Sequence, residues 1–209
     1  MFKRPAIASL VLLSALALLI APLAVARTGT ENLLGDGSFE NIAFGKLPSG
    51  ASLFSRPEGA YKAEVDDVGR TGKKSIMVAG EGEFGVLSFH RGELPSKSRF
   101  ALHGYVKIDG DADTKATIKF DLFKASGEWI ASCTAGDLTG ESKDWQHISV
   151  IDAFANYPEA RAFSVAVAIN GKGKAWFDDV EFVEIAAKDL HANLLPNGSF
   201  ENVPGKRAG

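Results

Sequence analysis

The sequence has one cysteine, Cys133, in 209 residues, so no disulfide can form within the chain. It has no run of basic residues, and its formal net charge is −3. Binding to a nucleic-acid backbone requires clustered Lys and Arg side chains, so nucleic acid is not an expected partner. The stability of the fold must therefore come from a packed apolar core or from a metal ion.

Motifs of the common catalytic and metal-binding classes are missing too. The spacing of the four histidines gives no HxxxH pair, which argues against a zinc site. No GxSxG, phosphate-binding loop or Cys-His arrangement occurs. We therefore expect a protein that is not an enzyme.

Only one long apolar run occurs, at residues 6–23, between the basic Lys3–Arg4 pair and a small-residue Ala-Val-Ala ending. This arrangement predicts a secretory signal peptide at residues 1–26. An uncleaved membrane anchor is the alternative, because about 18 apolar residues are long enough to span a bilayer. Cleavage would remove two bases and no acids, giving a net charge of 21 − 26 = −5. The expected location is secreted, periplasmic or at the cell surface, without membrane contact after cleavage.

The rest of the chain shows period-two alternation of apolar residues rather than a helical stripe. In three segments the alternation predicts these core-facing sets: Phe100, Leu102, Gly104, Val106 and Ile108; Ile118, Phe120 and Leu122; Phe163, Val165, Val167 and Ile169. Turn-forming Gly-rich and Asp-rich stretches separate these strands. The pattern predicts an all-β fold, an antiparallel β-sandwich of the jelly-roll type, over residues 31–187.

A ten-residue phrase occurs twice, as NLLGDGSFEN at residues 32–41 and NLLPNGSFEN at residues 193–202. The two copies are 193 − 32 = 161 positions apart, which corresponds to one module plus a linker. We therefore expect residues 188–209 to hold a linker and the first strand of a second repeat. The chain would then be a monomeric module of a longer protein.

The opening phrase, the Trp145 segment KDWQHISV and the final segment AWFDDVEF together resemble the carbohydrate-binding modules of families four and nine. The resemblance covers nearly all of residues 31–185. It implies a galactose-binding-like jelly roll that binds polysaccharide or another glycan without catalysis. It also implies that FSVAVAINGKGKAWFDDVEF, residues 163–182, forms the last two strands and their hairpin.

Two carboxylates, Glu40 and Asp178, are candidate metal ligands. Alternation in the last strand places Asp178 with Val180 and Phe182, so it would point inward, where an unpaired carboxylate costs several kcal/mol. Glu40 follows an apolar first strand that the family pattern sets beside the last one. The resemblance implies a structural Ca²⁺ ion held by these two side chains and by the carbonyl of Ser38. Alternatively, both carboxylates cap turns or accept backbone amides. A glycosidase pair is disfavoured, because no sugar could enter a strand-packing position.

Sugar recognition in such modules stacks aromatic rings on pyranose faces and adds polar contacts. The outward residues His103 and Tyr105 are the first candidates. Lys119, Asp121 and Phe123 would extend their surface if the two strands are neighbours, and the small residues Ser164, Ala166 and Ala168 would leave a concave floor.

A second hypothesis is a structural spacer or protein-interaction module that has no sugar site. Ala51 in the segment LPSGASLF favours this alternative, because many relatives have a tryptophan at that position. The small outward residues near Ala166 favour it as well.

Overall fold

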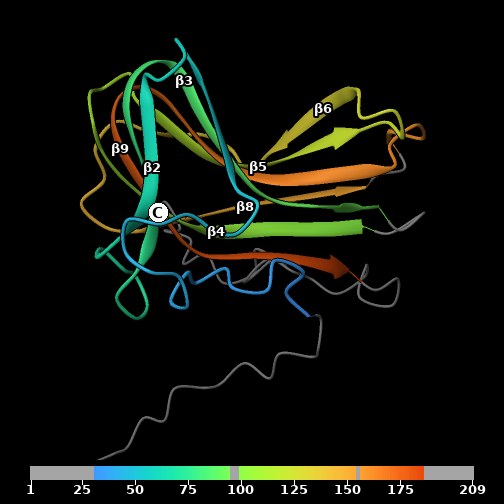
Figure 1. The fold of residues 1–209 in the computed structure, drawn as a ribbon, viewed down its shortest axis with the longest axis horizontal. Helices are drawn as coiled ribbons and strands as arrows, with labels where there is room; N and C mark the ends of the chain where they lie inside the picture. The colour runs from blue at the N-terminus through green and yellow to red at the C-terminus, as the bar shows by residue number, and fades with distance from the viewer. Residues whose placement is uncertain (1–30, 95–98, 154–155, 186–209) are drawn as a thin grey trace, which may run out of the picture.

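The computed structural model describes residues 31–94, 99–153 and 156–185, and these form an antiparallel β-sandwich without an α-helix (Figure 1). Its strands are β1 (Ser52–Arg56), β2 (Tyr61–Asp66), β3 (Ser75–Glu93), β4 (Arg99–Gly110), β5 (Lys115–Phe123), β6 (Trp129–Thr134), β7 (Leu138–Thr139), β8 (Gln146–Ala153) and β9 (Ala162–Ile185). Within these ranges no helix is long and apolar enough to cross a membrane. The expected signal peptide and second repeat lie outside the described residues.

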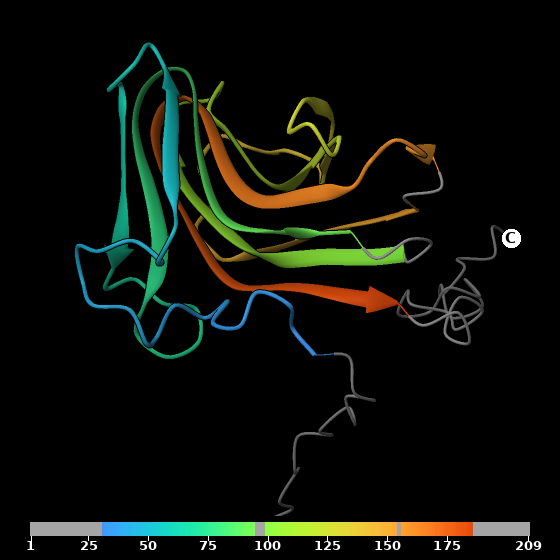
Figure 2. The same ribbon diagram turned by 45° about the vertical axis from the view of Figure 1, so that its right-hand side comes forward.

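Two long strands, β3 and β9, pair with each other and pass through both layers of the sandwich. Residues 75–82 and 173–185 lie with β2, β4 and β8, and we call this group the β4 layer. Residues 84–93 and 162–170 lie with β1, β5, β6 and β7, and we call this group the β5 layer. Figure 2 shows the two halves of β9, orange and red, running in separate layers.

Glycines allow both long strands to bend from one layer to the other. A Cβ atom on Gly80 would lie 2.2 Å from the carbonyl oxygen of Ala60, and Gly171 has a φ of 87°. The Tyr61 hydroxyl lies at this corner within hydrogen-bonding distance of the carbonyls of Gly82 and Gly171, so one side chain ties both bends together. Burial raises the pKa of Tyr61 above its ordinary value.

The predicted hairpin near residues 169–174 is wrong. Residues 162–185 form one strand, and the two halves of that strand pair with β3, β4 and β5 rather than with each other. A Gly-rich segment is compatible with a bend as well as with a hairpin, and here pairing along the 19-residue strand β3 selects the bend.

The core lies between the two layers, and the alternation of β4, β5 and the first half of β9 predicted its apolar side chains correctly. Phe182 lies near its centre. Its ring is stacked on Phe100 at 4.9 Å and lies 4.7 Å from Phe163 and 5.6 Å from Phe120, centroid to centroid. Since Phe120 and Phe163 belong to the opposite layer, this cluster holds the two layers together.

A β-bulge at Asp179 interrupts the alternation of β9. The register against β4 shifts here, and Asp179 has a φ of 49°, which is uncommon for a residue other than glycine. Phe177 and Val180 both belong to the core, so Asp178 lies on the outer face. The prediction that Asp178 points inward with Val180 was therefore wrong. Asp178 is nevertheless fully buried, because the loop at residues 69–74 covers it.

The opening phrase lies along the second half of β9, but residues 31–50 form turns rather than the predicted first strand. The Leu33 amide donates to the carbonyl of Phe182, and the Val180 amide donates to the carbonyl of Gly37, both at 2.9 Å. Asn32 adds side-chain hydrogen bonds to the backbone of the same two β9 residues. The beginning and the end of the described module are thus fastened side by side.

Candidate functional site

The structure separates the predicted ligand-binding residues into two groups. His103 and Tyr105 lie on the outer face of the β4 layer, whereas Lys119, Asp121 and Phe123 lie on the outer face of the β5 layer. β4 pairs with β8 and β9, and β5 pairs with β6, β7 and β9, so β4 and β5 are not neighbours. The two groups therefore cannot form one surface.

The outer face of the β4 layer has a hollow of about 550 Å³ beside His103 and Tyr105. The Arg70 guanidinium lies 3.4 Å from the Tyr105 ring centroid, and the His147 ring lies 5.1 Å away. His103 lies 3.5 Å from the carboxylate of Glu181. A sugar would have to displace Arg70 to reach that face of Tyr105, so this hollow is poorly prepared for stacking.

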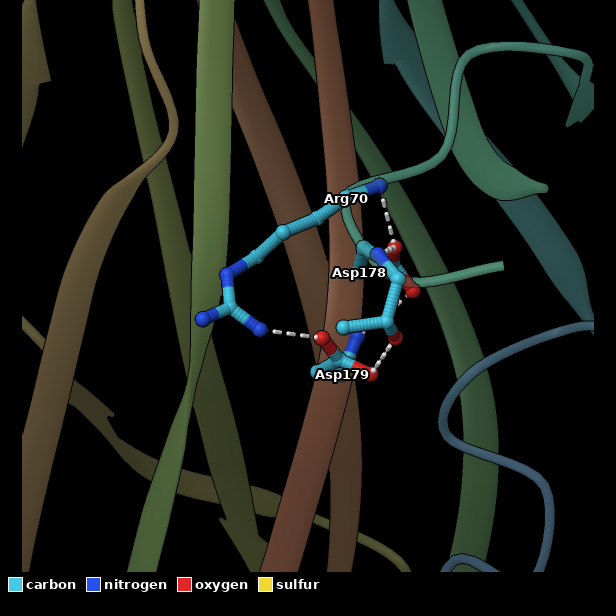
Figure 3. Close-up of polar contacts among 4 residues, drawn as sticks. Arg70, Asp178 and Asp179 are labelled. Atoms are coloured by element: carbon cyan, nitrogen blue, oxygen red, sulfur yellow. Dashed lines mark hydrogen bonds and ion pairs between the residues drawn. The ribbon is translucent and has the colours of Figure 1, made fainter. Parts of the chain in front are cut away.

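The bulge residue Asp179 is held by two side chains of the covering loop (Figure 3). Arg70 Nη1 lies 2.7 Å from Oδ2 of Asp179, and the Thr71 hydroxyl donates to Oδ1 at 2.6 Å. The same two loop residues donate their backbone amides to Oδ2 of Asp178, at 2.7 and 3.2 Å. The loop therefore holds the bulge and covers the buried carboxylate.

The predicted metal ligands Glu40 and Asp178 contact opposite ends of this loop. Glu40 Oε1 accepts the backbone amides of Lys73 and Lys74 at 2.8 and 2.7 Å. Asp178 accepts amides at both carboxylate oxygens, and burial raises its pKa to about 6. The third predicted ligand, Ser38, donates its hydroxyl to Asp36.

These surroundings fit a bound cation in part. Asp178 fits because it is a fully buried carboxylate whose hydrogen bonds in the described structure come from backbone amides, so its charge favours a nearby cation. Glu40 fits less well, since the ammonium of Lys74 lies 2.7 Å from the carbonyl oxygens of both Glu40 and Ile42. The described residues contain no group of three or more His, Cys, Asp or Glu side chains arranged for a metal.

The outer face of the β5 layer carries a groove. A hollow of about 510 Å³ opens there, lined by Ser49, Gly50, Ser52, Ser88, Phe89, Arg91, Phe123 and Ser164. In register, Ala166 lies between Ser88 of β3 and Lys119 of β5, and Ser164 lies between Arg91 and Asp121. Small side chains at the centre and larger ones at the sides give the surface its concave shape.

Polar and aromatic side chains border this floor. Lys119 Nζ lies 3.0 Å from Asp121 Oδ1, which also accepts a hydrogen bond from the Ser132 hydroxyl, so these groups are held in fixed positions. Phe123 lies opposite Trp129 of β6, a residue that is 57% exposed.

At the other edge of the layer, Phe54 of β1 is 61% exposed and packs against Phe84. Exposed rings thus stand on both edge strands of this layer.

Sequence reasoning identified Lys119, Asp121 and Phe123 as candidates, and it predicted the small-residue floor, but it did not identify Arg91 or Ser88. The alternation that places Ser88 outward was present in the sequence. Arg91 could not be placed, because a register irregularity between Ser88 and His90 reverses the alternation before it.

The fold and these faces define an antiparallel jelly roll with a grooved outer sheet. No protein-family model matches the chain, and no curated protein sequence matches it. Similar solved structures include TmCBM61 in complex with β-1,4-galactotriose, at 15% identity and a TM-score of 0.53 over 74% of this chain and 99% of that one. The CBM22-2 xylan-binding domain from Paenibacillus barcinonensis Xyn10C is similar at 12% identity and a TM-score of 0.52, over 73% and 99%.

A third similar structure is the enzymatically active domain of tailspike protein 4 from bacteriophage CBA120, at 13% identity and a TM-score of 0.51. The match covers 72% of this chain but only 21% of the tailspike chain. At these identities the likeness shows the fold alone. The predicted all-β jelly roll is confirmed, and several of its structural neighbours are carbohydrate-binding modules. Membership of family four or nine stays a prediction.

Proposed function

We propose that this protein is a non-catalytic module that binds polysaccharide in the groove on the β5 layer. The groove itself carries the proposal, because it combines a floor of small residues, a fixed Lys119–Asp121 pair and exposed rings at both edges. Aromatic rings stack on the apolar faces of sugars, and fixed polar groups bind their hydroxyls. The similar structures of carbohydrate-binding modules support this reading by analogy of fold.

The groove is a better candidate than the hollow beside Tyr105. Arg70 lies over the Tyr105 ring at 3.4 Å and is itself ion-paired to Asp179, so uncovering that ring would break an ordered contact. Trp129 and Phe54, by contrast, are residues that are already more than half exposed.

Affinity electrophoresis against a panel of soluble polysaccharides tests this function. We expect retardation by at least one glycan, and we expect Trp129→Ala and Phe123→Ala to weaken it. Tyr105→Ala is the matched control, because it removes an aromatic ring from the opposite face. If Tyr105→Ala alone abolished retardation, the site would lie on the β4 layer. If no glycan retarded the wild-type chain, the spacer or protein-interaction alternative would replace this proposal.

We also propose that a structural Ca²⁺ ion is held by Glu40, Asp178 and the Ser38 carbonyl. The support is the burial of Asp178 without a charged donor among its described hydrogen bonds, since a divalent cation would offset the cost of burying that charge. The ion would hold the opening phrase and the 69–74 loop against β9 and would take no part in sugar binding.

The signal-peptide prediction for residues 1–26 supports an exported protein. We propose that the module acts outside the cytoplasm, either secreted, periplasmic or on the cell surface, where polysaccharides are accessible. Signal-peptide cleavage after Ala26, measured by mass spectrometry of the exported chain, tests this proposal.

A further inference from the structure

We infer that the groove on the β5 layer binds an anionic glycan, one whose sugars carry uronate carboxylates or sulfate esters. This inference rests on the proposed function and specifies its ligand class.

The groove continues beyond its first hollow into a second one of about 380 Å³, and Arg91 lines both. Ser164 lines the first hollow and Ala162 the second, and these two β9 residues lie two positions apart on the same face of the layer. An extended polysaccharide lying along this face would therefore pass Arg91 and enter the second hollow.

Cations predominate along the second hollow. Arg91, Lys124 and Arg161 line it, and Glu93 is the acidic residue among its lining. Lys124 lies 2.9 Å from Glu128, which offsets its charge. The chain as a whole is acidic, with a net charge of −3, so this local excess of positive charge runs against its composition.

The two arginines have guanidinium groups available for an anion. Arg91 lies over the Phe123 ring at 4.9 Å, and Arg161 donates to the carbonyls of Pro158 and Ala160 at 2.7 Å. Among the described residues neither guanidinium is within ion-pair distance of a carboxylate. A guanidinium binds a carboxylate or a sulfate through two parallel hydrogen bonds, which suits an acidic sugar better than a neutral one.

Position supports the same reading. The Arg91 guanidinium lies 4.9 Å from the Phe123 ring centroid and lines the first hollow, so a sugar bound in that hollow would have its substituents within reach of the guanidinium. Cations at the end of a groove also attract a polyanion from a distance, and added salt weakens this attraction.

Isothermal titration of the full chain with polygalacturonate and with its fully methyl-esterified form tests the inference, because the two polymers share a backbone and differ in charge. We expect polygalacturonate to bind at least about tenfold more tightly than the esterified polymer. This difference in affinity should shrink near 1 M salt, because the Debye screening length there is only about 3 Å. A sulfated galactan forms a third arm: tighter binding to it than to polygalacturonate would assign sulfate esters as the charged group.

Arg91→Gln and Arg161→Gln should each weaken binding of the charged polymer more than binding of the esterified polymer, and so reduce the preference for charge. Arg56→Gln is the matched control, because Arg56 is paired with Glu83 and lines neither hollow. Equal affinity for charged and neutral polymers, or a preference that survives both arginine substitutions, would overturn the inference and leave the proposed function standing. Binding to no glycan of any kind would overturn the proposed function instead.

Discussion

Gly37 is the residue at which the opening phrase passes closest to β9. A Cβ atom added there would lie 1.8 Å from the carbonyl oxygen of Val180 and 2.9 Å from its carbonyl carbon. Both atoms belong to a central strand that cannot move away. The substitution Gly37→Ala must therefore push the opening phrase off the last strand.

The resulting loss of stability can be estimated from the hydrogen bonds that hold the opening phrase against β9. Four hydrogen bonds join residues 32–37 to the backbone of β9. The Leu33 amide donates to Phe182 and the Val180 amide donates to Gly37, while the Asn32 side chain donates to the carbonyl of Val180 and accepts from the amide of Phe182. At about 1 kcal/mol each, their loss would cost about 4 kcal/mol. A domain of this size melts about 2–4 °C lower for each kcal/mol lost, so we expect the melting temperature to fall by about 10 °C.

Scanning calorimetry of Gly37→Ala and Gly35→Ala measures this effect against a matched control. Gly35 lies in the same phrase with a φ of 72°, but an added Cβ would meet nothing within 4 Å. Its substitution should cost only the left-handed backbone strain of about 1–2 kcal/mol. If Gly37→Ala melted no lower than Gly35→Ala, the phrase would not be fastened to β9 as described.

Two further predictions concern the buried carboxylate Asp178. At a Ca²⁺ concentration of 100 times the dissociation constant, the free energy of unfolding should rise by about 2.7 kcal/mol, and the melting temperature should rise with it. No rise in the melting temperature of the wild type, or an equal rise in Asp178→Ala, would contradict the calcium proposal. In a chelating buffer, burial raises the pKa of Asp178 from 3.8 to about 6, so the native state favours the protonated form. The stability contributed by this group is complete below pH 3.8 and is lost as the pH rises through about 6. The melting temperature of the wild type relative to Asp178→Asn should fall over that range, and a constant difference would refute the assignment.

The fold was predictable because its strands carry a strong local pattern. Phe100, Phe120 and Phe163 each occupy a position that alternation marks as inward, and each is buried in the core. The same pattern failed at Asp178, because a bulge one residue later reverses the alternation, and a bulge arises from pairing with a neighbouring strand. The alternation also predicted two separate strands within residues 162–185. The local sequence does not show that both halves of this segment pair with one long strand, β3.

The candidate sites show the same division. Alternation within one strand predicted that Lys119, Asp121 and Phe123 share an outward face. Their separation from His103 and Tyr105 could not be predicted in this way, because it depends on which layer each strand joins. Arg91 entered the groove only through pairing between β3 and β9. The sequence by itself determined the strands and their inward faces, since each side chain alternates with its own backbone. The tertiary structure decided which outward faces meet, because layer assignment and bulges are set by long-range pairing that no single segment encodes.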